Sequence, residues 1–347
     1  MVIDDMQRDN SEMKTVYPPR VLREWLECNS ISGFYENLKR KVWGQDEELK
    51  KAAIMIYGFI TAMANNAFDR KFHFMIEGAS GCGKSTFAYR LQELLPIPVL
   101  VLDSSTITPS GYKGTNIAEI LASEELEKFW GCGILVADEL DKLMQPTHSS
   151  EGNFHQEALH NFLKLMDGGV LTLKDGTVFP CNKLLVIGMG AFSPLRQPQT
   201  VPVRRNIGFC AERLSEAAQA PQRPVEQNIT KEQMTAFCGS EQFLGRFLTV
   251  LHFEKLGKEA FHKIVWQTEA EIREVYGCGF GLPMEERLML IEKAMTADFG
   301  ARGIKSAVWE AFLSNPDEWG IMTRQAANPQ MDFDAFFGEN MERIMSA

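Results

Sequence analysis

The chain has 347 residues, of which 45% are hydrophobic and 24% are charged, and its net charge is −10 at pH 7. This length suggests two domains, or one with appendages; the acidic balance argues against a general nucleic-acid surface, although it leaves room for a local basic pore. No apolar run approaches the roughly 20 residues that span a bilayer, and the polar N-terminus is not expected to be a signal peptide. The seven cysteines show no C-x-x-C pair and no zinc spacing, which suits reduced thiols in a cytoplasm.

The first predicted elements are two short amphipathic helices between residues 18 and 41, followed by a longer helix from residue 46. Apolar residues such as Leu22 and Phe34 recur in them at helical spacing. The turn Val42-Trp43-Gly44-Gln45 lies between the second and third helices. A hydrophobic turn just upstream of a phosphate loop can contact an adenine base, and a plain helix-start turn fits the spacing equally well.

Residues 78–85, GASGCGKS, match the phosphate-binding pattern G-x-x-x-x-G-K-[ST]. The glycines let backbone N–H groups turn inward around phosphate oxygens, Lys84 reaches the outer phosphates, and the Ser85 hydroxyl ligates Mg²⁺. A strand-like apolar run, residues 72–76, precedes the loop, and a helical pattern closed by prolines follows it. Phosphates would then lie at a helix N-terminus, where free N–H groups favour anions. The sequence therefore predicts a nucleotide site.

Two carboxylates end a second buried strand pattern. Residues 133–139, GILVADE, form an apolar run that ends in Asp138 and Glu139. Together with the upstream phosphate loop, this run predicts an ATPase site in which Asp138 holds the Mg²⁺ shell and Glu139 orients the attacking water. Between the two motifs, a strand at residues 99–103 leads into a polar loop with Tyr112 between two glycines. Tyr112 is either a mobile contact residue or a packed loop anchor, and composition does not separate these.

The remaining pattern completes an α/β fold. The next predicted elements, in chain order, are a helix at 156–166, a strand at 184–188, an extended loop at 196–240 and a strand at 248–251. Strands that alternate with helices predict a parallel sheet covered on both faces. Three apolar stripes beyond residue 253 predict a small helical domain. We expect residues 1–38 to form a polar tail with short helices, residues 39–252 an α/β ATPase domain with a parallel five-stranded sheet, and residues 253–347 a small, mostly helical domain.

In the order of these motifs the chain resembles the ClpX family of AAA+ unfoldases, over about residues 18–340. The turn at 42–45 is similar to the family's adenine-side turn, residues 103–114 to its first pore loop, residues 138–142 to its Walker B segment, and residues 151–168 to its second pore loop and helix. Residues 243–247 resemble the segment with the arginine finger, at Arg246, and residues 300–303 the start of the sensor-2 helix, with Arg302 facing the nucleotide. Without this motif order, both arginines would be ordinary surface or helix-terminal charges.

The resemblance implies a ring, usually a hexamer, with ATP and Mg²⁺ bound between neighbouring subunits. Glu139 and Arg246 would then be catalytic, and an arginine finger accelerates hydrolysis by about 10³–10⁵. Ser85 and Asp138 would hold the metal. The residues expected to bind nucleotide are Val42, Trp43, Gly78, Ser80, Gly81, Cys82, Gly83, Lys84, Ser85, Thr86 and Arg302.

The chain departs from the family at three places. Only Cys28 precedes Cys82, so we expect the family's N-terminal zinc domain to be missing and the substrates and adaptors to differ. In the substrate pore, Lys113 follows Tyr112 where the family has an aliphatic residue, which admits acidic substrates. The strand at 184–188 leads into Met189, Gly190 and Ala191, with no amide or hydroxyl side chain at its tip, so no sensor-1 residue is assigned.

A tripeptide in the long loop, Ile207-Gly208-Phe209, is similar to the one that docks ClpX-like unfoldases onto the ClpP peptidase. Two large apolar side chains on such a loop are good anchors for a partner's pockets, or they tuck back against their own domain. The sequence does not decide between these two hypotheses.

The leading functional hypothesis is an ATP-hydrolysing ring motor that unfolds or remodels protein substrates by threading them through a central pore, with a ClpP-like peptidase as a further partner. The first alternative is a nucleotide-switched assembly or scaffold ATPase. The second is a DNA-handling AAA+ protein, against which the net acidity counts. No membrane partner is expected.

Overall fold

The computed structural model consists of two compact units. It describes residues 18–107, 117–121, 123–145, 154–172, 176, 178–196, 228–297, 300–315 and 319. The chain divides between Lys255 and Leu256 into an α/β unit and a helical unit.

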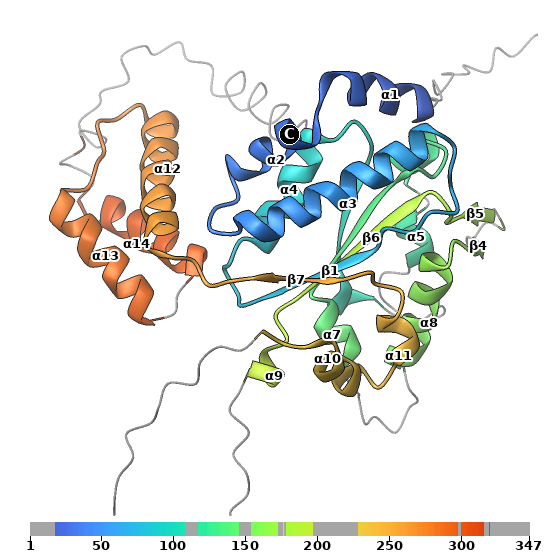
Figure 1. Cartoon of the computed structure of the whole chain (residues 1–347). Helices are drawn as coiled ribbons and strands as arrows, with labels where there is room; N and C mark the ends of the chain where they lie inside the picture. Colours follow the sequence, from blue (N-terminus) through green and yellow to red (C-terminus); the bar gives the residue numbers. More distant parts are fainter. Residues whose placement is uncertain are drawn as a thin grey trace, which may run out of the picture. The chain divides into compact units, whose positions relative to one another are not determined.

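A five-stranded parallel sheet forms the centre of the first unit, in the order β2-β3-β6-β1-β7 (Figure 1). The strands are β1 (Phe74–Gly78), β2 (Val99–Asp103), β3 (Gly133–Asp138), β6 (Leu184–Gly190) and β7 (Val250–Phe253). Each neighbouring pair is parallel, so all five strands end at the same edge of the sheet. Their nearly continuous apolar sequences suit strands that are covered on both faces. The predicted fold class is confirmed.

Helices cover both faces of this sheet, and alternate side chains of each strand enter two separate cores. In β1, Phe74 and Ile76 belong to one core and Met75 to the other, as the two-residue period of a strand requires. The first core is completed by α1 (Pro18–Cys28), α2 (Ile31–Lys39), α3 (Asp46–Ala64) and α4 (Lys84–Leu94). The second is completed by α5 (Ile117–Leu121), α6 (Glu124–Lys128), α7 (Leu140–Met144), α8 (Phe154–Met166), α10 (Lys231–Cys238) and α11 (Glu241–Leu244).

Helices α1 and α2 belong to the first unit, so residue 38 is not a boundary between compact units. Leu22, Phe34 and Leu38 are buried in the core that they share with α3. The Trp25 indole Nε1 donates a hydrogen bond to the Leu94 carbonyl at the end of α4, at 3.1 Å. The predicted boundary at residue 252 likewise falls inside β7, which pairs with β1.

Two regions after α8 differ from the sequence-based expectation. Strands β4 (Val170–Thr172) and β5 (Val178–Pro180) form an antiparallel hairpin that is too short to produce a recognisable pattern. Helix α10 lies in the stretch predicted to be an extended loop, and the prediction is wrong there because Thr230 and Gln233 form a capping box that starts the helix. Strands β1 and β7 begin at Phe74 and Val250, slightly later than predicted.

The described residues of the second unit form three helices, α12 (Lys258–Tyr276), α13 (Met284–Ala297) and α14 (Gly300–Ser314). Each contributes apolar side chains to a common core, including the buried residues Ile264, Ile272, Ile291, Val308 and Phe312. The predicted helical C-terminal region is confirmed.

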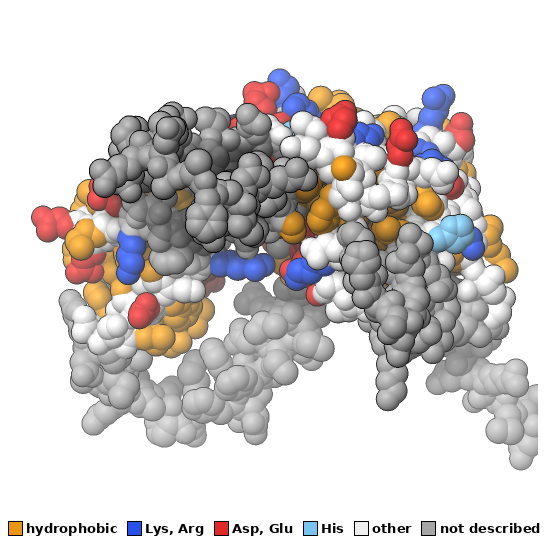
Figure 2. All heavy atoms as spheres, turned by 90° about the horizontal axis from the view of Figure 1, so that it is seen from below, with side chains coloured by type: hydrophobic (Ala, Val, Ile, Leu, Met, Phe, Trp, Pro, Cys, Tyr) orange, Lys and Arg blue, Asp and Glu red, His pale blue; other side chains and the backbone are white. Residues whose placement is uncertain are grey.

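The surface of the described residues mixes charges of both signs. On the face shown in Figure 2, the visible Lys and Arg side chains of the described residues are scattered among Asp and Glu and do not form a broad basic patch. Within the described parts of the chain, we find no helix with the length and apolar character needed to cross a membrane.

Candidate active site

The phosphate loop joins β1 to α4 at the edge where the parallel strands end (Figure 1). Gly81 and Gly83 have φ angles of +78° and +106°, a left-handed backbone that glycine adopts without the steric cost of a Cβ. A Cβ on Gly78 would lie 2.5 Å from the carbonyl oxygen of Phe253, so the loop starts pressed against the end of β7. The strand and the helix that the motif requires therefore both flank the loop.

Lys84 begins α4, and its side chain folds back over the phosphate loop. The ammonium Nζ donates to the carbonyl oxygens of Gly78 at 2.6 Å and Ala79 at 3.0 Å. This places a positive charge within the loop, within reach of phosphate oxygens bound there. The Sγ atom of Cys82 lies 3.8 Å from Nζ, and burial raises the pKa of this thiol. A neutral, buried thiol supports the interpretation of Cys82 as a small loop residue, since the thiolate is the reactive form.

Ser85 and Asp138 bring two oxygen ligands together from different elements. The Ser85 hydroxyl, in the first turn of α4, donates to Asp138 Oδ2 at the end of β3 at 3.3 Å. The other carboxylate oxygen, Oδ1, accepts the backbone N–H of Glu139 at 2.9 Å, which orients the group. Mg²⁺ is usually held by one or two protein oxygens together with phosphate oxygens and water, so this pair fits the ion. Among the described residues there is no group of three or more His, Cys, Asp and Glu that could hold a metal.

Glu139 stands next to this pair in a left-handed backbone conformation, with φ +54° and ψ +31°. Such a conformation is uncommon for a residue with a Cβ, and it is concentrated at functional sites where the surrounding structure fixes it. The carboxylate forms an ion pair with Lys142 of α7, and 43% of the Glu139 side chain is exposed. The acidic group therefore lies beside the hydrogen-bonded pair of Ser85 and Asp138 and remains open to solvent.

The turn before α3 is fastened to the phosphate loop by Gln45. This side chain is 3% exposed; its amide donates to the carbonyl oxygens of Cys82 at 3.1 Å and Glu254 at 2.8 Å. Its own carbonyl accepts the Glu254 N–H at 2.9 Å. Gln45 occupies the N-cap position of α3 but makes no capping bond there. The turn therefore starts a helix and also packs beside the phosphate loop, with Val42 buried and Trp43 half-buried.

Arg246 lies at the other edge of the sheet. It follows α11 and precedes the first residue of β7, whereas the phosphate loop follows the last residue of β1, and these two strands are parallel. Its guanidinium is paired with Asp167, Nε to Oδ1 at 2.5 Å and Nη2 to Oδ2 at 3.1 Å. Arg246 is therefore directed away from the phosphate loop of its own chain.

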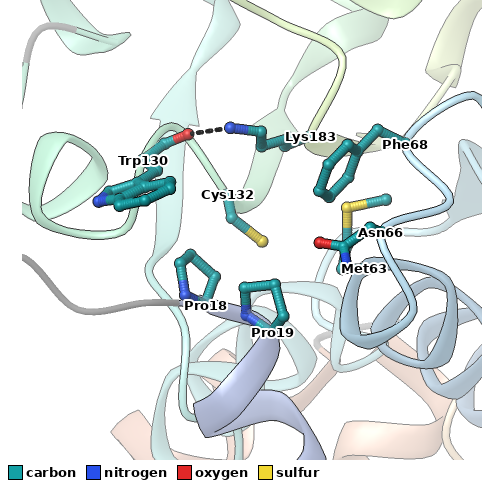
Figure 3. Close-up of a pocket in the computed structure, with 8 residues that line it drawn as sticks. All are labelled: Pro18, Pro19, Met63, Asn66, Phe68, Trp130, Cys132 and Lys183. Carbon is teal, nitrogen blue, oxygen red and sulfur yellow. Dashed lines mark hydrogen bonds between the residues drawn. The ribbon is translucent and has the colours of Figure 1, made fainter.

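A cavity of about 160 Å³ also lies away from the phosphate loop. It is bounded by Cys132 and Lys183, which immediately precede β3 and β6, and by the start of α1 (Figure 3). Lys183 points across the cavity toward Trp130 and donates to its carbonyl oxygen at 3.0 Å. The other residues that line the cavity are Pro18, Pro19, Met63, Asn66 and Phe68. This mainly apolar lining is unsuited to a polyphosphate, so the cavity is not a second nucleotide site.

Several sequence-predicted residues cannot be placed next to this geometry. Tyr112, Lys113, residues 151–153 and the segment Ile207-Gly208-Phe209 lie outside the described residues. Arg302 is exposed in the first turn of α14, in the second unit.

Comparisons with known proteins point to an ATPase family. The model of the ATPase family associated with various cellular activities (AAA) matches residues 74–202, which include the phosphate loop and both acidic residues after β3. The chain is 26% identical over 272 residues to an ATP-dependent Clp protease ATP-binding subunit, ClpX 2, of Wolinella succinogenes, covering 70% of this chain and 65% of that protein. The ClpX subunits of Bacteroides fragilis and Bacteroides thetaiotaomicron are each 24% identical over 78% and 80% of this chain, and over 72% and 68% of their own length.

The chain is a ClpX-like AAA+ ATPase. It spans about two thirds of the length of these relatives, and the family match at residues 74–202 includes the phosphate loop, Asp138 and Glu139. We therefore interpret the residues of the site in terms of ATP hydrolysis.

The sequence of this ClpX-like ATPase gave no reason to single out Gln45, Glu77 or Asp141 as individual side chains. Glu77 and Asp141 are 1% and 6% exposed. A weak signal was available for Glu77, because it is the single charge in the apolar strand that leads into the phosphate loop. Gln45 and Asp141 are ordinary polar residues next to known motifs, and their partners come from distant parts of the sequence.

Proposed function

We propose that this ATPase is a ring-forming cytoplasmic motor that unfolds or remodels protein substrates by threading them through a central pore. The supporting observation is the separation of its proposed catalytic groups. Lys84, Ser85, Asp138 and Glu139 meet at one edge of the sheet, and Arg246 lies at the other. A site that uses Arg246 is complete only when a second copy supplies it, as in other nucleotide hydrolases with a finger provided in trans.

The chain's own residues divide the chemistry among them. The phosphate loop and Lys84 hold the phosphates, and the turn fastened by Gln45 lies beside the loop on the adenine side. Ser85 and Asp138 would hold Mg²⁺, which would neutralise charge on the phosphate oxygens. Glu139 would orient and polarise the water that attacks the γ-phosphate, and Arg302 is our proposed nucleotide sensor. The neighbour's Arg246 stabilises the charge that develops in the transition state.

The test measures both the assembly of the ring and its ability to unfold a protein. Mass photometry with and without ATP measures the ring, and loss of fluorescence from a folded reporter carrying an unstructured tag measures unfolding. We expect ATP-dependent rings, stimulation of ATPase activity by the reporter, and no unfolding by Glu139→Gln. An active ATPase that neither responds to protein substrates nor unfolds the reporter would favour the scaffold hypothesis.

The pore and docking segments have separable effects in this proposal. Tyr112→Ala should leave basal ATPase activity largely intact and abolish unfolding, because the bulky face that pushes on the substrate is lost. Phe209→Ala should leave both activities intact and affect only degradation in the presence of a ClpP-like peptidase. Loss of basal ATPase activity in Phe209→Ala would show that Ile207 and Phe209 pack against their own domain.

A DNA-handling role is disfavoured by the net charge of −10 and by the mixed charges on the face in Figure 2. A protein that binds DNA through its phosphates loses affinity steeply with salt. A salt-dependent shift of duplex or single-stranded DNA at micromolar protein would overturn this conclusion.

A further inference from the structure

Glu77 is a buried carboxylate directly in front of the phosphate loop. It is the penultimate residue of β1, it is 1% exposed, and it shares its strand face with Met75, on the side of the sheet that α7 and α8 cover. An ionised carboxylate in such a place is strongly unfavourable unless it is paired and hydrogen-bonded. The position of Glu77 therefore depends on the groups that face it.

Two side chains from neighbouring chain segments pair with Glu77. In the sheet, Glu77 lies opposite Gly190 of β6 and His252 of β7. One carboxylate oxygen contacts the His252 Nδ1 at 2.8 Å, and the other forms an ion pair with Arg196, the last residue of α9 (Ser193–Arg196). The carboxylate thus connects the ends of the three strands that border the phosphate loop.

Arg196 makes a second contact that reaches the tip of β6. Its Nε donates to the carbonyl oxygen of Ala191 at 3.1 Å. The N–H of the same peptide bond, that of Phe192, donates to Asp141 Oδ2 at 3.0 Å. The Ala191–Phe192 peptide is therefore held from both sides, by a cation on its oxygen and by a carboxylate on its nitrogen.

This peptide is also strained and tightly packed. Phe192 is fully buried and has a φ of +49°, a conformation that side chains with a Cβ rarely adopt and that surrounding contacts must enforce. A Cβ on Gly190 would lie 2.9 Å from Asp141 Oδ1 and 2.8 Å from the Phe192 ring, so the tip of β6 presses directly on Asp141. Asp141 is only two residues beyond Glu139, at the start of α7.

We propose that Glu77, Arg196 and Asp141 are positioning residues that set where Glu139 lies relative to the phosphate loop. The connection runs from β1 through Glu77 and Arg196 to the Ala191–Phe192 peptide, and from there through Asp141 to α7. It occupies the tip of β6, where the sequence offers no amide or hydroxyl side chain. The inference rests on the proposed roles of Lys84 and Glu139 in ATP hydrolysis and does not depend on protein unfolding.

The test uses the full chain and compares Arg196→Ala, Asp141→Ala and the double variant. Each single variant should lower kcat by about 10- to 100-fold, the range expected when a reacting group is displaced by about 1 Å. The ATP dissociation constant, measured by displacement of a fluorescent ATP analogue, should change by less than about twofold, because the lost interaction acts only on the reacting geometry. The double variant should be no worse than the worse single variant, since both act through one peptide bond.

Two further variants separate positioning from general stability. Asp141→Asn keeps an oxygen that can accept the Phe192 N–H, so it should restore most of the kcat lost in Asp141→Ala. His73→Gln is the matched control: His73 is also buried, at 1% exposure, and bridges Met166 and Val186 at 2.9 Å each, next to the start of β1. It should lower the melting temperature without lowering kcat.

The outcomes are distinguishable. Unchanged kcat in both alanine variants, additive losses in the double variant, or losses of kcat and ATP affinity that follow the melting temperature would overturn the positioning role. If Arg196→Ala does not fold, the two Asp141 variants still decide, because they leave the Glu77 ion pair intact. Normal turnover in Glu139→Gln would instead show that the proposed active site is wrong.

Discussion

Gln45→Ala gives a quantitative test of how the phosphate loop is held. The substitution removes three hydrogen bonds, to the carbonyl oxygens of Cys82 and Glu254 and from the Glu254 N–H. Each such bond contributes about 1 kcal/mol net, so the free energy of unfolding should fall by about 3 kcal/mol. For a domain of this size, that corresponds to a decrease in melting temperature of about 6–12 °C.

The same substitution should weaken ATP binding, because the phosphate loop and the turn before α3 are no longer joined. If half of the lost free energy, about 1.5 kcal/mol, is lost from ATP binding, the affinity for ATP falls about tenfold. Calorimetric melting and displacement of a fluorescent ATP analogue measure the two effects. Gln92→Ala is the matched control, because Gln92 makes one hydrogen bond, to the Val99 carbonyl at 2.8 Å, and should have about a third of the effect on stability. Equal melting temperatures and ATP affinities in wild type and Gln45→Ala would refute this account of the loop.

Three further predictions concern catalysis and stability. Glu139→Gln should bind ATP normally and hydrolyse it very slowly, because the amide keeps the shape but loses the charge that polarises water; near-normal turnover would contradict the assignment. Arg246→Ala should bind ATP without turnover and regain partial activity when mixed with Glu139→Gln subunits, whose Arg246 completes its site; mixed rings that are inactive at every ratio would exclude a finger in trans. Burial lowers the pKa of His73 to about 4, and the unfolded imidazole titrates near its usual 6.5, so the unfolded state binds more protons between these values. The contribution of His73 to the free energy of unfolding should therefore be constant above about pH 6.5 and should fall by up to about 3 kcal/mol as the pH approaches 4. Urea titrations of His73→Gln at several pH values should not show this loss.

The sequence was sufficient for the parts of the fold that depend on local pattern. Apolar runs located the five strands, and the phosphate-loop motif with Asp138 and Glu139 located the edge of the sheet that carries the site. These features can be predicted because each is encoded by consecutive residues. The capping box at Thr230 is also local, but it was obscured by the polar, proline-rich stretch before it, so α10 was predicted as loop.

The groups that the sequence did not reveal depend on contacts between distant segments. Gln45 is separated from Glu254 by 209 residues and Glu77 from Arg196 by 119. No spacing rule connects such positions, and a polar side chain becomes significant only when burial leaves it no water to bind. The sequence therefore predicts which residues contact ATP and Mg²⁺, and it does not reveal the residues that hold them in place.

The pairing of Arg246 with Asp167 is compatible with a finger that acts in a neighbouring subunit. The pair is exposed, with 40% and 49% of the two side chains open to solvent, and exposed ion pairs contribute only about 0–1 kcal/mol to stability. Arg246 holds the pKa of Asp167 below its usual range, so the carboxylate remains charged and keeps the guanidinium directed outward from the end of α11. A bidentate contact to phosphate in a partly closed subunit interface is stronger than an exposed pair of this kind. In the proposed ring, Arg246 would exchange its exposed pair with Asp167 for a stronger contact to a neighbour's nucleotide, which only a formed interface supplies.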